Sequence, residues 1–176
     1  MSSTDNALAS EQAAEIHPVT IHRLVEVFEL LDAEYVIVDK PAEDADEPQL
    51  VLQTGIPHVS IHLDIEEDIL SAFATWQARL PASAEDEISL TLSQFNWESV
   101  APTLSYLVEE GAKGNEEILV GANRAMAVGE GMSQQQLAAF VLSAFDSFGE
   151  IFDALAQHYP QAAPWAAGNA ADSEEN

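Results

Sequence analysis

Histidines are the residues of this chain best suited to metal or acid–base chemistry, and their spacing can be tested directly. His58 and His62 lie on one face of a predicted strand over residues 58–63, and four strand residues span about 13 Å at ~3.3 Å each. Ligands of one zinc ion must converge to within ~2.1 Å of the metal. His17 and His22 flank a predicted helix start. Neither pair predicts a metal site, and we expect His58 and His62 to be exposed on their strand.

An acidic run, Asp64-Ile65-Glu66-Glu67-Asp68, is the second candidate for metal chemistry. It lacks the glycine and the regularly spaced oxygen ligands of an EF-hand loop, so a solvated acidic turn is the favoured interpretation over loose Ca²⁺ binding. Paired carboxylates could also hydrolyse glycosides, but acids occur along the whole chain and none stands out as paired. We therefore predict no metal-binding residues.

No nucleophile motif accompanies these acids. The chain has no cysteine, which excludes thiol catalysis and thiolate metal sites. It also has no glycine-rich phosphate loop and no serine in a nucleophile elbow. The sequence predicts that the protein is not an enzyme and has no catalytic residue and no cofactor.

The net charge is −26, because 31 acids face only five basic residues: Arg23, Lys40, Arg79, Lys113 and Arg124. Phosphate binding depends on positive side chains that release counterions, so this composition argues against nucleic acid, nucleotide and anionic lipid partners. It favours electrostatic capture of basic proteins. A solvated acidic surface with no specific partner and an adaptation to salty surroundings agree with the composition as well.

The chain offers no membrane or export signal. No apolar run approaches the ~20 residues that span a bilayer. The first 16 residues contain neither a basic residue nor the apolar block of a signal peptide. We expect a cytoplasmic protein with no membrane partner.

The widest apolar face belongs to a predicted helix over residues 133–158. Ser133 stands three residues before Gln136, the spacing of a capping box, and Pro160 ends the helix. Apolar residues recur every three or four positions between them. Core packing, a dimer interface or a client groove would each use such a stripe. The candidate protein-contact residues are Phe140, Phe145, Phe148, Phe152 and Tyr159.

The first half of the chain predicts one helix followed by strands. Thr20 is the expected N-cap of a helix that ends near Leu31, with apolar residues at helical spacing. β-branched and aromatic residues predict the strands. The strand segments are 35–38, 49–53, 58–63 and 69–76, with an acidic loop over 41–48 between the first two.

The second half alternates helix and strand. A helix should begin at Ser83, with acids in its first turn facing the positive end of the helix dipole, and end near Asn96. Strands over 103–109 and 117–128 should be joined by a turn over 111–115, whose two glycines tolerate positive φ. The last strand has small residues on one face, which allow close packing: Gly121, Asn123, Ala125 and Ala127.

This order defines an α+β fold. We predict a mostly antiparallel sheet of about five strands with three helices, in the sequence helix, strands, helix, two strands, helix. Residues 18–160 should form a single domain. The polar, acidic segments 1–17 and 161–176 should be disordered tails.

The order and spacing of these features resemble the YbjN family of small bacterial proteins, which are named as sensory transduction regulators and share the fold of type III secretion chaperones. The resemblance extends from Thr20 to Pro160. It depends on the first helix and the Tyr-containing strand after it, and on five short motifs: Trp76 with Arg79-Leu80-Pro81, Phe95-Asn96, Pro102, Gly131-Met132-Ser133-Gln134-Gln135-Gln136-Leu137, and Tyr159-Pro160.

Two departures from the family pattern stand out. Family members commonly have Trp-Asn and then a basic residue at the end of the second helix, where this chain has Phe95-Asn96-Trp97-Glu98. A glycine often follows the first helix, where this chain has Asp32-Ala33. The resemblance implies a protein-interaction module, often dimeric, with no active site to carry over. The shared acidity of secretion chaperones is an analogy, since fold does not establish function.

The sequence thus favours a non-enzymatic, chaperone-like or regulatory module that binds a client protein or peptide with a sheet or helix surface and forms a homodimer. The alternative is an acidic mimic of nucleic acid that sequesters a basic DNA- or RNA-binding protein. Salt separates the two hypotheses, because exposed charge pairs are screened beyond the ~8 Å Debye length at physiological salt, whereas an apolar contact persists.

Overall fold

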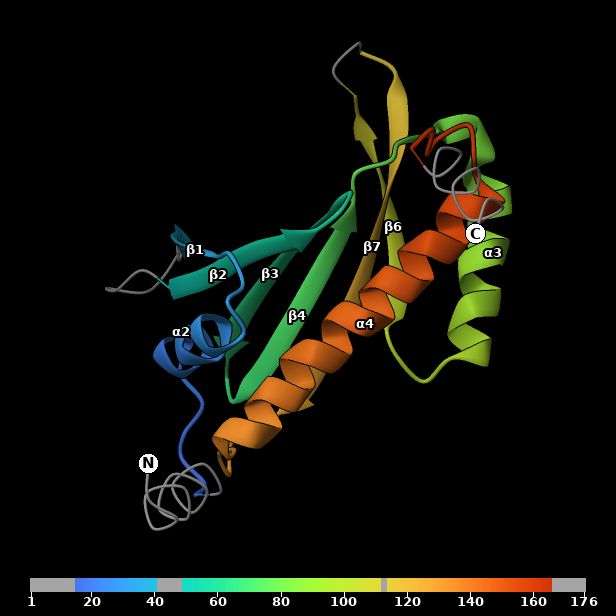
Figure 1. Ribbon diagram of the computed structural model, residues 1–176. Coiled ribbons are helices and arrows are strands. Elements are labelled where there is room, and N and C mark those ends of the chain that lie inside the picture. Colours follow the sequence, from blue (N-terminus) through green and yellow to red (C-terminus); the bar gives the residue numbers. More distant parts are fainter. Residues whose placement is uncertain (1–14, 41–48, 112–113, 166–176) are drawn as a thin grey trace, which may run out of the picture. The chain divides into compact units, whose positions relative to one another are not determined.

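The computed structural model describes residues 15–40, 49–111 and 114–165. Within these ranges the chain forms three α-helices and seven strands, with the 3-10 turn η1 (Ala82–Ala84) before α3 (Figure 1). The elements in order are α2 (Ile21–Leu30), β1 (Val36–Lys40), β2 (Gln49–Ile56), β3 (Val59–Glu66), β4 (Ile69–Trp76), β5 (Leu80–Pro81), α3 (Glu85–Glu98), β6 (Thr103–Glu110), β7 (Glu116–Ala127) and α4 (Gln134–His158).

The strands of the described residues form one sheet in the order β1-β2-β3-β4-β7-β5, with β6 also beside β7. The predicted α+β class is therefore confirmed, but the count of about five strands is wrong. β2 is a full strand of eight residues. β5 has only two residues, and its pairing with β7 (Leu80↔Ile118, Pro81↔Glu117) defines it, so no periodicity in the sequence could reveal it.

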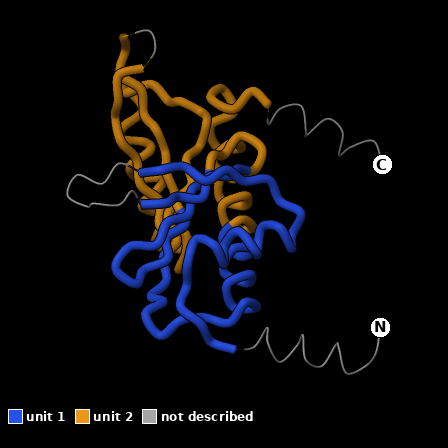
Figure 2. Tube along the Cα trace, turned by 90° about the vertical axis from the view of Figure 1, so that its left-hand side faces the viewer, with its two compact units in different colours: residues 1–55, 61–72, 125–144 blue, residues 56–60, 73–124, 145–176 orange. Residues whose placement is uncertain are grey.

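The chain divides into two compact units (Figure 2). Unit 1 comprises Met1–Gly55, Ile61–Ala72 and Ala125–Ala144, and unit 2 comprises Ile56–Ser60, Phe73–Arg124 and Phe145–Asn176. Most of the predicted tails and all of the predicted acidic loop over 41–48 lie outside the described residues. The described ends of the tails are held by the fold: the backbone of His17 pairs with that of Met132, and Ala163 is buried.

Unit 1 contains helix α2, which is capped by hydrogen bonds at both ends. Thr20 accepts a hydrogen bond from the Arg23 N–H at 3.3 Å, as an N-cap does, so this prediction is confirmed. After the last turn, Asp32 takes φ 53°, and the Ala33 N–H donates to the Phe28 carbonyl at 3.0 Å. This is the Schellman arrangement, in which glycine is the usual residue. Asp32 thus stands where the resemblance led us to expect glycine.

The acidic run in unit 1 forms a strand end and a tight turn. Asp64 to Glu66 continue β3, while Glu67 and Asp68 take φ values of 48° and 64°. Two successive positive φ values characterise the type I′ turn, whose twist matches that of the strands it joins. The prediction of an acidic connection over residues 64–68 is therefore right only for its last two residues.

Unit 2 contains α3, the β6–β7 hairpin and the second half of α4. β6 and β7 pair in antiparallel register from Thr103↔Asn123 to Glu110↔Glu116. Of the two glycines on which the predicted turn depended, only Gly114 has a positive φ, at 75°. Acids fill the first turn of α3, but its N-cap is Ala84 and no side chain caps it, so the predicted Ser83 cap is wrong. The intervening η1 turn places Ser83 before the helix start.

The predicted capping box of α4 is confirmed. The Ser133 N–H donates to Gln136 Oε1 at 2.8 Å, and the Gln136 N–H donates to Ser133 Oγ at 3.2 Å. Each side chain thereby satisfies a backbone donor that the helix end leaves without a partner.

Gly131, two residues before Ser133, takes φ 81° and lies against the His17 carbonyl, so a side chain there would clash. No helix in the described ranges is long and apolar enough to cross a membrane.

Candidate protein-binding surface

The apolar stripe of α4 lies inside the protein. Four of the five candidate contact residues are buried, and the fifth, Phe145, is partly exposed. Core packing, one of the three interpretations left open by the sequence, describes the four buried side chains, which leaves them no area for a partner. The buried residues are Phe140, Phe148, Phe152 and Tyr159.

Interactions within unit 2 show how two of these aromatic residues are held. The ring of Phe152 stacks on that of Trp76, with ring centroids 6.2 Å apart. The Tyr159 hydroxyl hydrogen-bonds to the hydroxyl of Thr91 on α3, with 3.0 Å between the oxygens. A buried tyrosine needs such a partner for its hydroxyl. The end of α4 is therefore fixed to α3 by a polar contact as well as by packing.

The histidines are not gathered into a site. His58 lies in the turn before β3 rather than on the strand, with φ 65°, and its ring stacks on that of Trp165 at 4.1 Å. His62 is on β3 but half-buried rather than exposed, and this burial lowers its pKa, opposed by the nearby Asp64 carboxylate.

The remaining histidines that we considered for metal binding make local contacts. His17 Nε2 lies 3.4 Å from a Glu15 carboxylate oxygen, and His22 Nδ1 lies 3.2 Å from one of Glu26. In the part of the chain that the structure describes, no three His, Asp or Glu side chains are grouped so that they could hold a metal ion.

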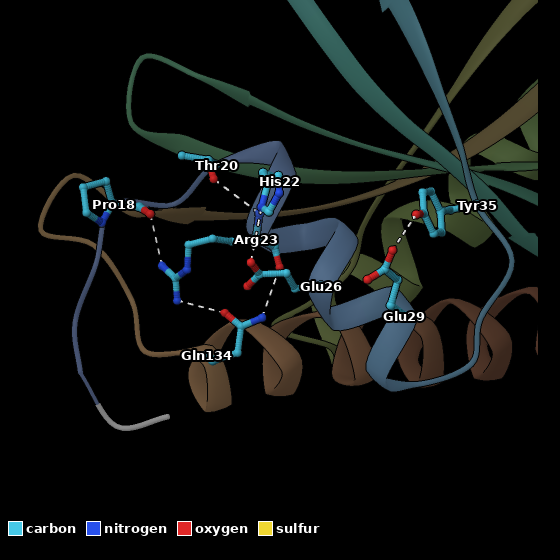
Figure 3. Close-up of polar contacts among 8 residues, drawn as sticks. All are labelled: Pro18, Thr20, His22, Arg23, Glu26, Glu29, Tyr35 and Gln134. Carbon is cyan, nitrogen blue, oxygen red and sulfur yellow. Dashed lines mark hydrogen bonds and ion pairs between the residues drawn. The ribbon is translucent and has the colours of Figure 1, made fainter. Parts of the chain in front are cut away.

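Arg23 is the centre of a polar network in unit 1 (Figure 3). Its Nη1 donates to the carbonyls of His17 and Pro18 at 2.9 and 3.1 Å, and its Nη2 donates to Gln134 Oε1 at 3.0 Å. Gln134 Nε2 donates back to the Arg23 carbonyl at 3.2 Å. The guanidinium thus joins α2, the segment before it and the start of α4. We assign it a structural role, since its donors are directed at these acceptors.

The outer face of α3, in unit 2, is the most exposed apolar surface on a helix of the described chain. Trp97 is 91% exposed and Leu90 is 74% exposed, and Val100 just beyond the helix is fully exposed. Leu90 and Trp97 are seven residues apart, so they lie on one side of the helix. The opposite side packs inward through Ile88 and Leu92. We call the side that carries Leu90 and Trp97 the outer face of α3.

Polar residues lie between these apolar side chains: the small Ser93 and the longer, exposed Gln94, whose Nε2 donates to Glu98 Oε1 at 3.1 Å. Ser93 lies on the same side of α3, between Leu90 and Trp97. Its hydroxyl donates back to the Ser89 carbonyl of its own helix at 2.7 Å. Ser93 therefore has a hydrogen-bond partner without water, and a second element could approach the helix closely at this point.

The inner side of α3 is fastened to β6, which fixes the direction of the outer face. Asn96 Nδ2 donates to the Leu104 carbonyl at 3.0 Å, and the Leu104 N–H donates to Asn96 Oδ1 at 2.7 Å. This pair of bonds is what a neighbouring strand would make with Leu104. At the other end of α3, the Tyr106 hydroxyl donates to Glu85 at 3.2 Å. The outer face is thus presented by a helix held at both ends.

The sequence contained a signal for this surface that our prediction did not use. The helix over residues 85–98 has apolar residues on two sides, Ile88 and Leu92 on one and Leu90 and Trp97 on the other. A helix buried on one side needs only one apolar stripe. The Phe95-Asn96-Trp97 motif, which we used only for the resemblance, includes both the clamp residue Asn96 and the exposed Trp97.

The described chain has the architecture of a small α+β protein with an antiparallel sheet and three helices. A crystal structure of YbjN from E. coli, a proposed transcription regulator, is similar to it, with a TM-score of 0.55 and 14% identity over 78% of this chain and 91% of that chain. At this identity the likeness shows the fold alone, and to that extent the predicted resemblance is confirmed. No protein-family model and no curated protein matches the sequence.

Proposed function

We propose that this chain is a non-enzymatic protein-binding module that forms a homodimer and acts on a client protein as a chaperone or regulator. The outer face of α3 is the observation that carries the proposal. Single exposed apolar residues are ordinary on protein surfaces. Here a tryptophan and a leucine, 91% and 74% exposed, share one side of a helix whose other side is already packed.

The spacing of the outer face suits a second copy of the same chain. If two α3 helices pack antiparallel about a twofold axis near Ser93, Leu90 of each copy meets Trp97 of the other. An interface of this kind is self-complementary, as twofold symmetry requires. Glu98 of each copy then lies opposite Ser89 of the other, and the acids of the first turn, Glu85, Asp86 and Glu87, lie beyond the end of the partner helix at Glu98. Like charges therefore do not oppose this arrangement locally.

The charge of the chain supports a basic client. With 31 acids and five bases, long-range attraction speeds encounter with positive proteins and repels nucleic acid. A client held by charge alone would dissociate as salt rises, whereas one that also buries apolar surface would remain bound. The YbjN-like fold agrees with an interaction role, since the E. coli protein is itself proposed to be a regulator.

Sedimentation velocity of the full chain over a range of concentrations tests the dimer. We expect a concentration-dependent dimer that Leu90→Ser converts to monomer. Leu142→Ser is the matched control, because Leu142 is an exposed leucine (46%) on α4 rather than on α3. A wild-type chain that remains monomeric at every concentration, or a Leu90→Ser variant that still dimerises fully, would contradict the proposal.

A further inference from the structure

Unit 2 has a second apolar surface, on the side of its sheet opposite the buried core. Along β7, Ile118, Val120 and Ala122 are buried, while alternate residues point to the other side. On that side Leu107 of β6 lies directly opposite Leu119 of β7 and is 50% exposed. Residues in direct register project from the same face of a sheet. The two leucines therefore form an apolar pair on this face.

Phe73 of β4 extends this pair across the next strand. A Cβ atom placed on Gly121 of β7 would come within 2.9 Å of the Phe73 ring, so the ring lies over the strand where the glycine leaves room. Gly121 is two residues from Leu119, on the same face. Phe73, Leu119 and Leu107 thus form an apolar row across β4, β7 and β6, which we call the sheet row. The close packing predicted for the small-residue strand is thus found at Gly121, whereas Asn123, Ala125 and Ala127 are exposed.

The face that carries the sheet row borders solvent: Leu107 is exposed, and Phe73 and Leu119 are partly exposed. Thr103, Ser105 and Asn123 project from the same side of β6 and β7, and all three are exposed. The described side chains on this side of the hairpin therefore form a surface rather than a core. A row of one aromatic and two leucine side chains, bordered by exposed polar residues, has the composition of a binding patch rather than of a solvated strand face.

Carboxylates lie beside the sheet row, further along β6 and β7. Glu109 and Glu117 are in direct register across β6 and β7, two residues beyond Leu107 and Leu119 on the same face. Like charges directly opposite each other destabilise a strand pair. Arg79 Nη2 lies 3.3 Å from Glu109 Oε1, and Asn115 donates to Glu117 Oε1 at 3.2 Å. One arginine thus stands against two opposed glutamates, which leaves net negative charge beside the apolar row.

We propose that this face of unit 2 binds a basic amphipathic segment of another protein. Apolar side chains of the segment cover Phe73, Leu119 and Leu107, and its Lys or Arg side chains approach Glu109 and Glu117. The inference rests on the proposed function, since it names the surface and the chemistry of the client. Charge selects this occupant over a second copy, because two copies face to face would bring the opposed glutamates of both together in a desolvated interface.

Fluorescence anisotropy with designed peptides and the full chain tests the proposal. The first probe is a labelled peptide with Leu and Lys at amphipathic helical spacing. The second has Glu at every Lys position, and the third is an oligolysine without Leu. We expect the Leu/Lys peptide to bind more tightly than oligolysine and to keep part of its affinity at high salt. The Leu/Glu peptide should not bind.

Surface variants locate the binding site. Leu107→Ser should weaken the Leu/Lys peptide about tenfold, as expected when one exposed leucine loses its contact. Glu109→Gln with Glu117→Gln should weaken it at low salt and flatten its salt dependence. Leu30→Ser in unit 1 is the matched control, because Leu30 is an exposed leucine (76%) outside this surface, and it should leave affinity unchanged.

The outcomes separate this inference from the proposed function. Equal affinity of wild type, Leu107→Ser and the double glutamine variant for the Leu/Lys peptide would overturn the sheet row as its site. If Leu90→Ser weakened the peptide instead, the client would bind at the outer face of α3, and the binding module would stand without this inference. A chain that binds none of the peptides would overturn the inference, and if it also remained monomeric the proposed function would fail with it.

Discussion

Helices α3 and α4 both carry apolar residues at helical spacing, yet they use them in opposite ways. The stripe of α4 is buried, including Phe148 at 0% exposure, and its start is closed by a reciprocal capping box. α3 buries only Ile88 and Leu92 and exposes Leu90 and Trp97, and no side chain caps its start. The difference shows that apolar residues at helical spacing are buried only where other segments of the fold cover them, as they do on α4. A second stripe on a shorter helix marks the surface.

The largest change in stability should come from a substitution in the buried stripe of α4. Phe148→Ala should lower the free energy of unfolding by about 4 kcal/mol, because it removes a fully buried ring and leaves a cavity. Urea unfolding followed by far-UV circular dichroism measures this loss. A change below about 1 kcal/mol would mean that the α4 stripe is not part of the core, and the contrast between α4 and α3 would be wrong.

A substitution on the exposed outer face of α3 should affect self-association rather than the stability of the monomer. Trp97→Ser should change the free energy of unfolding of the monomer by no more than about 0.5 kcal/mol, as for surface substitutions in general. It should weaken self-association about a hundredfold, because each twofold interface loses two buried tryptophans. Sedimentation equilibrium gives the association constant, and urea unfolding at a concentration where the wild type is monomeric gives the stability. A large loss of monomer stability would place Trp97 in the core instead.

The clamp that orients α3 gives an intermediate effect. Asn96→Ala removes both hydrogen bonds to Leu104 and should cost about 2 kcal/mol, since a net hydrogen bond contributes roughly 1 kcal/mol and the partners become unsatisfied. Asn96→Asp is the matched variant, because it keeps the acceptor for the Leu104 N–H but loses the donor to its carbonyl. Hydrogen exchange at the Leu104 amide should be accelerated by Asn96→Ala and less by Asn96→Asp. Equal protection in all three chains would show that the clamp does not hold β6.

The smallest effect concerns the start of α4. Ser133→Ala removes the acceptor for the Gln136 N–H and should cost about 1 kcal/mol, the usual value for a lost N-cap. Gln136→Ala and the double variant complete a mutant cycle. We expect the two losses to be less than additive, because the two side chains form one reciprocal box. Strict additivity in thermal or urea unfolding would show that the bonds act independently.

Local sequence patterns determined the elements of this protein. Thr20, Ser133 with Gln136, and Pro160 predicted helix ends correctly, and alternation of apolar residues predicted the strand over 69–76 to the residue. These signals depend on interactions within a few positions of the chain, so the sequence alone contains them. The absence of cysteine and the charge of −26 were likewise complete in the sequence.

Tertiary structure alone decided which apolar residues are covered. The exposure of Trp97 and the burial of Phe148 follow from what packs against each helix, and that depends on segments distant in the sequence. The same holds for β5, which exists only through its pairing with β7, and for Asn96, whose bonds to Leu104 cross eight residues. The sequence placed the aromatic residues on their helices. Packing between distant segments determined that the exposed apolar helix face lies on α3 and not on α4.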